Sequence, residues 1–91
     1  MSWSTGTKVS VSKAEADAAI DALTTGTSDP MHEDQLRVAK QAAKLLLTNI
    51  PGPYVRVNLN GHANGVGWQK REGWSSDCIT VSVTQTYEPS A

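Results

Sequence analysis

Two stretches in the second half of the chain alternate between apolar and polar residues, over residues 54–60 and 79–84. The apolar positions are every second residue: Val55, Val57 and Leu59 in the first stretch, and Ile79, Val81 and Val83 in the second. A period of two with β-branched residues is typical of strands with one buried face. We therefore predict two strands joined by a long loop over residues 61–77. A shorter alternation over residues 8–12 predicts a further strand.

Helical spacing follows residues 8–12. Ser12 and Glu15 form a Ser-x-x-Glu capping box, in which the two side chains satisfy backbone N–H groups at a helix start. This helix is predicted to run to about Thr24, with Gly26 supplying the left-handed residue that ends it. Its buried stripe is expected to contain Ala16, Ala19, Ile20 and Leu23.

A second helix is predicted from Pro30 to about Asn49. Asp29 suits its N-cap, and Pro30 at the first helical position loses no hydrogen bond. Pro51 disfavours helical geometry at Ile50 and ends the helix. The expected apolar stripe is Leu36, Ala39, Ala43, Leu46, Leu47 and Ile50, with Ala42 beside it. The expected solvated face is Arg37, Lys40, Gln41 and Lys44, with an i,i+4 pair between Glu33 and Arg37.

These elements follow the order β-α-α-β-β within residues 1–91, which suits one α+β domain. The simplest packing places both helices on one face of a small antiparallel sheet. Such a sheet has exposed edges, and an exposed edge can pair with a second copy or with another protein. Residues 1–7 and 88–91 are expected to be mobile, with the alternative that Trp3 anchors the first of these segments.

Composition narrows the function classes. The chain has 91 residues and no Phe, so its core consists of small side chains and a partner subunit would add to its stability. A net charge of −1 gives no general attraction to nucleic acid or anionic lipid. No apolar run approaches the roughly 20 residues that span a bilayer, and the first residues do not resemble a signal peptide. A single cysteine, Cys78, excludes an intrachain disulfide.

The loop over residues 61–77 carries the candidate binding residues. They are two large aromatic rings, two cations and a histidine at the loop start: Trp68, Trp74, Lys70, Arg71 and His62. Tryptophan and arginine are enriched in binding hot spots, and long loops often carry function. Two interpretations stay open. Either the rings bind a protein partner, or at least one of them folds back over the sheet as part of the core.

Catalytic and metal-binding patterns are weak. A dyad of His62 and Cys78 would lack a third group and an oxyanion hole. Combinations such as His32 with Glu33, or His62 with Asp77, do not have the ligand number of a metal site. His32 is more simply a surface residue in the first helical turn. We therefore predict no catalytic residue, no metal and no cofactor.

The basic residues Arg37, Lys40 and Lys44 are the candidate for nucleic-acid contact. The order β-α-α-β-β is found in part of a KH domain, but no Gly-x-x-Gly joins the two helices; residues 25–29 read TGTSD instead. Because acidic residues balance the cations, a solvated helix face is the better interpretation.

Three segments resemble small proteins of actinobacterial tailed phages. They are residues 57–64 (VNLNGHAN), 73–77 (GWSSD) and 81–85 (VSVTQ). The resemblance implies a phage origin and a location in the host cytoplasm or the virion, and it assigns no functional residue.

The sequence thus favours a non-enzymatic protein-interaction module that binds a protein of the host or virion or forms a homo-oligomer. The first alternative is a small enzyme or ligand binder centred on the 61–77 loop and His62. The second alternative is a nucleic-acid binder that uses the basic helix face.

Overall fold

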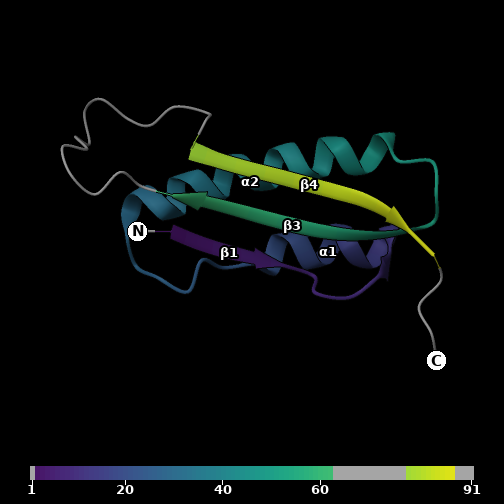
Figure 1. Ribbon diagram of the computed structural model, residues 1–91, viewed down its shortest axis with the longest axis horizontal. Helices are drawn as coiled ribbons and strands as arrows, with labels where there is room; N and C mark the ends of the chain where they lie inside the picture. The colour runs from purple at the N-terminus through teal and green to yellow at the C-terminus, as the bar shows by residue number, and fades with distance from the viewer. Residues whose placement is uncertain (1, 63–77, 88–91) are drawn as a thin grey trace.

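The computed structural model describes residues 2–62 and 78–87. Its elements, in chain order, are β1 (Ser2–Gly6), β2 (Val11–Ser12), α1 (Lys13–Ala22), α2 (Pro30–Asn49), β3 (Tyr54–His62) and β4 (Ile79–Thr86). The strands form one antiparallel sheet, and both helices pack on the same face of it (Figure 1). The predicted α+β class, with two helices on one face of the sheet, is confirmed.

β3 is the central strand. It pairs with β4 on one side and with both β1 and β2 on the other. β1 lies beside residues 58–62 of β3 and β2 beside residues 54–55, so together they form one interrupted edge row. In the interruption, the Thr7 N–H donates to the Val57 carbonyl (3.0 Å), and the Thr7 hydroxyl accepts from the Val57 N–H (3.2 Å). From β2 onward the order is the predicted β-α-α-β-β, and β1 is an additional strand that the sequence pattern did not predict.

The predicted strand over residues 8–12 is wrong except at Val11–Ser12. Lys8 adopts a left-handed backbone with φ of 65°, which turns the chain and leaves Val9 60% exposed. The strand lies earlier instead, at Ser2–Gly6, where only Trp3 is a large apolar residue. Of the two possibilities for this segment, the structure shows the one in which Trp3 anchors it.

Trp3 is held by a hydrogen-bonded link to α2 and β3. Its ring packs on Gly61, where an added Cβ would lie 2.6 Å from the indole Nε1. The Trp3 Nε1–H donates to Gln35 Oε1 (2.8 Å), and Gln35 Nε2 donates to the His62 carbonyl (2.9 Å). Trp3 is 4% exposed and Gln35 is fully buried. One amide side chain therefore joins β1, α2 and β3.

The core lies between the helices and the sheet. Alternate residues of β3 are fully buried at its centre: Val55, Val57 and Leu59. On β4, the apolar residues at the same face of the sheet are only partly buried: Ile79, Val81 and Val83. Gln85, which lies opposite Val55, is also on this face and is exposed. The opposite face of β3 carries the exposed Arg56, Asn58 and Asn60. The sheet is thus apolar under the helices and polar on its other face, as the alternation predicts.

The capping box at the start of α1 is confirmed. The Glu15 N–H donates to Ser12 Oγ (3.1 Å), and the Ser12 N–H donates to Glu15 Oε1 (3.4 Å). The helix ends at Ala22, before the predicted Thr24, because Leu23 is already extended. Gly26 is left-handed (φ 75°) as expected, but it lies in the connection to α2 and not at the helix end.

The predicted limits of α2 are confirmed. Asp29 caps the helix by accepting from the Met31 N–H (2.8 Å), and Ile50 is extended before Pro51. No helix in residues 2–62 or 78–87 is both long and apolar enough to cross a membrane.

Three expectations for α2 side chains are wrong. Leu46 is 42% exposed and not part of the buried stripe. His32 is fully buried and not at the surface; its Nδ1 lies 3.1 Å from Thr27 Oγ1, and its Nε2 has no hydrogen-bond partner among the described residues. Arg37 pairs with Asp34 (2.5 Å) at i−3 and not with Glu33.

Replacing Gln35 with Leu tests the link to Trp3. We expect Gln35→Leu to lower the free energy of unfolding by about 1–3 kcal/mol, because the buried Trp3 Nε1–H loses its acceptor. The matched control is Gln41→Leu on the exposed side of α2, which should change stability by under about 0.5 kcal/mol. Urea unfolding followed by circular dichroism measures both. Equal losses in the two variants would show that the link contributes nothing.

Candidate functional site

Most of the sequence-predicted binding residues lie outside the described residues: Trp68, Lys70, Arg71 and Trp74. Binding through them therefore stays a prediction. His62 is described, and it is the last residue of β3, with an exposed side chain and a carbonyl that accepts from Gln35. Cys78 is half-buried immediately before β4.

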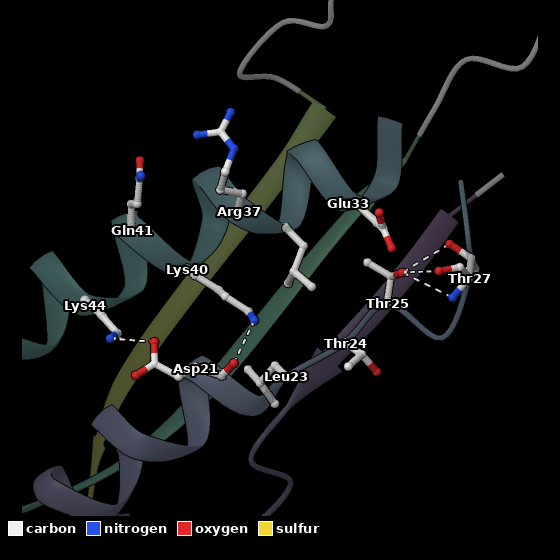
Figure 2. A pocket seen from close by; sticks show the side chains of 11 residues that line it. Asp21, Leu23, Thr24, Thr25, Thr27, Glu33, Arg37, Lys40, Gln41 and Lys44 are labelled. Carbon is white, nitrogen blue, oxygen red and sulfur yellow. Dashed lines mark hydrogen bonds and ion pairs between the residues drawn. The ribbon is translucent and has the colours of Figure 1, made fainter. Parts of the chain in front are cut away.

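A groove of about 480 Å³ lies between the two helices and the segment that joins them (Figure 2). Its lining residues are Asp21, Leu23, Thr24, Thr25, Thr27, Glu33, Leu36, Arg37, Lys40, Gln41 and Lys44. The volume falls in the range of small-ligand pockets. Lys40 and Lys44, on the helix face that was expected to be solvated, line this groove and are partly exposed there.

The two lysines in this groove have partners within the chain. Lys44 Nζ lies 2.7 Å from Asp21 Oδ1 and 4.0 Å from Asp17 Oδ1. Lys40 Nζ donates to the Asp21 carbonyl (3.0 Å), as Figure 2 shows. The hydrogen bond that Lys44 donates to Asp21 raises the pKa of Lys44. Partial desolvation lowers it by less, and the negative charges of Asp21 and Asp17 raise it further. These contacts fasten the end of α1 to the middle of α2.

The groove lining has threonine hydroxyls, carboxylates, amines and a guanidinium group, but no cysteine, serine or histidine. Across the part of the chain that the structure describes, no three His, Cys, Asp or Glu side chains group as a metal site would require. The contacts across the groove join the two helices, and the groove has the volume to hold a small molecule.

A different arrangement lies at the outer edge of β4. Both backbone groups of Val57 bond to Thr7 and so point away from β4. Val83 lies opposite Val57, and the backbone groups of such an antiparallel pair point away from each other. Along a strand, the backbone N–H and C=O groups of every second residue point to the same side. Outward groups belong to Ile79, Val81, Val83 and Gln85, whereas those of Thr80, Ser82, Thr84 and Thr86 point to β3.

The described residues of this outer edge lack several features that keep sheet edges from pairing. Those features are charges, prolines, bulges and short strands. β4 has eight residues, ITVSVTQT, with no charge, proline or glycine. The other edge row of the sheet, by contrast, is interrupted at Lys8 and ends in the two-residue β2. Among residues 2–62 and 78–87, no strand pairs with the outer side of β4.

An apolar flank of α2 lies beside this edge. α1 packs over β2 and β3, whereas α2 packs over β3 and β4 (Figure 1). The groove-lining residues of α2 and the flank lie on opposite sides of the buried stripe Ala39, Ala43 and Leu47. The flank follows helical spacing and consists of Val38, Ala42, Leu45 and Leu46, of which Leu45 is 67% exposed and Leu46 42% exposed. We call β4 (Ile79–Thr86) with this flank the β4 edge surface.

Sequence reasoning did not find the flank, although a signal existed. Residues 45–47 are three consecutive leucines. Because successive helical residues are separated by about 100°, three in a row cannot all face one sheet. At least one of them had to be exposed or to face a partner.

Comparison of the chain with family models, with curated proteins and with solved structures finds no match.

The Lys44 contacts give a pH prediction. The pKa of Lys44, measured by NMR titration, should lie above its ordinary value of 10.5. Because the folded pKa is raised, the stabilisation is present below pH 10.5 and is lost as pH rises through the higher folded pKa. Asp21→Asn should lower the Lys44 pKa more than Asp17→Asn, since Asp21 Oδ1 is the closer oxygen. The reverse order would contradict the assignment.

Proposed function

We propose that this protein is a non-enzymatic protein-interaction module, which acts by adding a strand of a protein partner to the outer edge of β4. The observation that carries the proposal is the eight-residue edge without charge, proline or glycine. Its outward N–H and C=O groups, at every second residue from Ile79 to Gln85, are the main-chain donors and acceptors that strand addition uses.

The side chains of β4 support specificity in such a contact. On the helix side, Ile79, Val81 and Val83 are apolar and only partly buried and Gln85 is polar, so an added strand with apolar residues at alternate positions would extend the core over the first three. Those on the other side are small and polar: Thr80, Ser82, Thr84 and Thr86. Main-chain bonds would give affinity, and the alternation would fix which side of the partner strand faces the helices.

The resemblance to proteins of actinobacterial phages supports a partner from the virion or the host. The predicted binding loop also fits, because Trp74 precedes β4 by only five residues in the sequence. The predicted binding loop and β4 are therefore neighbours in the sequence.

A photoreactive amino acid at Thr84, on the polar face of β4, tests the proposal in host cells and in phage particles. We expect ultraviolet light to produce a covalent adduct with a protein at this position. The matched control is the same amino acid at Ala18, an exposed position of α1, which should give no adduct.

Val83→Pro provides the second arm of the experiment. Proline removes an outward N–H while leaving the bonds to β3 in place, so the Thr84 adduct should disappear. Circular dichroism must show that the variant is folded. No adduct at Thr84, or an adduct that persists in folded Val83→Pro, would overturn strand addition.

A further inference from the structure

The apolar flank of α2 restricts what can occupy the β4 edge surface. A single added strand would cover β4 but would leave Leu45 exposed one layer above it. A suitable partner therefore supplies both a strand and an apolar helix flank in the same relative positions. This chain itself has that combination, in β4 and in the residues Val38, Ala42, Leu45 and Leu46.

A second copy is also complementary in charge and in direction. β4 has no charged residue, so an identical edge approaches without like-charge repulsion. Residues with outward backbone groups all have their side chains on the helix side of the sheet. Under a two-fold axis, the two antiparallel edges therefore bond while the apolar side chains of both copies meet on one face.

The size of this surface suits a modest dimer. Eight strand residues span roughly 26 Å, and a sheet with its helix layer is roughly 20 Å deep. Each copy would then contribute roughly 500 Å², which gives a total near the lower limit of specific interfaces, about 1,000 Å². The small core of the chain would gain stability from this added burial.

We propose that the partner strand is β4 of a second copy, so that the chain forms a two-fold dimer with paired β4 strands and facing α2 flanks. This inference rests on the proposed function and specifies its partner. The C-terminal end of α2 and the end of β4 lie at the same end of the molecule (Figure 1). Leu45 and Leu46 of each copy therefore contact the partner near the C-terminal end of their own β4 strand.

Sedimentation equilibrium of the purified chain, up to about 1 mM, tests the dimer. We expect a monomer–dimer equilibrium that Leu45→Gln weakens by about tenfold or more, because two leucines per dimer lose their apolar burial. The matched control is Val9→Gln, which replaces another exposed apolar residue (60%) in the turn between β1 and β2. This control should leave the dimer unchanged, and neither variant should unfold the monomer.

Amide hydrogen exchange, measured by NMR, shows which surface is used. As the concentration rises, exchange should slow at the outward amides of Val81, Val83 and Gln85. The inward amides of Ser82 and Thr84 already bond to β3, so their exchange should change much less. This alternation would not appear if the copies associated through the helices alone.

Two results would overturn the dimer. One is a chain that stays monomeric throughout the concentration range. The other is a dimer that is unaffected by Leu45→Gln and leaves the outward amides unprotected. If the Thr84 adduct in cells then contains a different protein, strand addition stands and only the second copy is wrong. If the adduct is also absent, the proposed function fails as well.

Discussion

The buried amide of Gln35 is the constraint on which the arrangement of the sheet depends. Its oxygen and nitrogen are both out of water, so each needs a partner, and they find the Trp3 indole and the His62 carbonyl. A buried polar group left unpaired costs more than an ordinary hydrogen bond contributes. This requirement holds a mostly polar segment, Ser2–Gly6, against one side of β3. β4 then takes the other side and forms the long outer edge of the sheet.

Local patterns predicted the elements whose signals lie within a few residues. The alternation from Val55 to Leu59 fixes a strand because only one of its faces can be buried, and Asp29 and Pro30 mark a helix start because their roles are local. β1 was missed because its one strong determinant is Trp3. The burial of Trp3 depends on Gln35 and Gly61, which are distant from it in the sequence. The burial of His32 likewise depends on tertiary packing and not on its place in the first helical turn.

The two flanks of α2 have different roles. Toward α1, Lys40 and Lys44 reach Asp21 and fix the relative position of the helices. Arg37, the third cation first considered for nucleic-acid contact, pairs with Asp34. All three cations thus have a partner among the described residues. The other flank has no such contacts to make and is apolar. Because these contacts fix α1 relative to α2, the apolar flank keeps one orientation over β4. The β4 edge surface is therefore preformed.

The interrupted edge row at Lys8 has a consequence for assembly. A sheet with two long edges can recruit copies at both sides, and repeated head-to-tail addition of that kind produces fibres. In this chain the row of β1 and β2 turns away at a left-handed residue and resumes for only two residues. A growing ribbon would find no continuous template there. The proposed association through β4 would consequently be self-limiting, and it would end with a closed dimer instead of an open polymer.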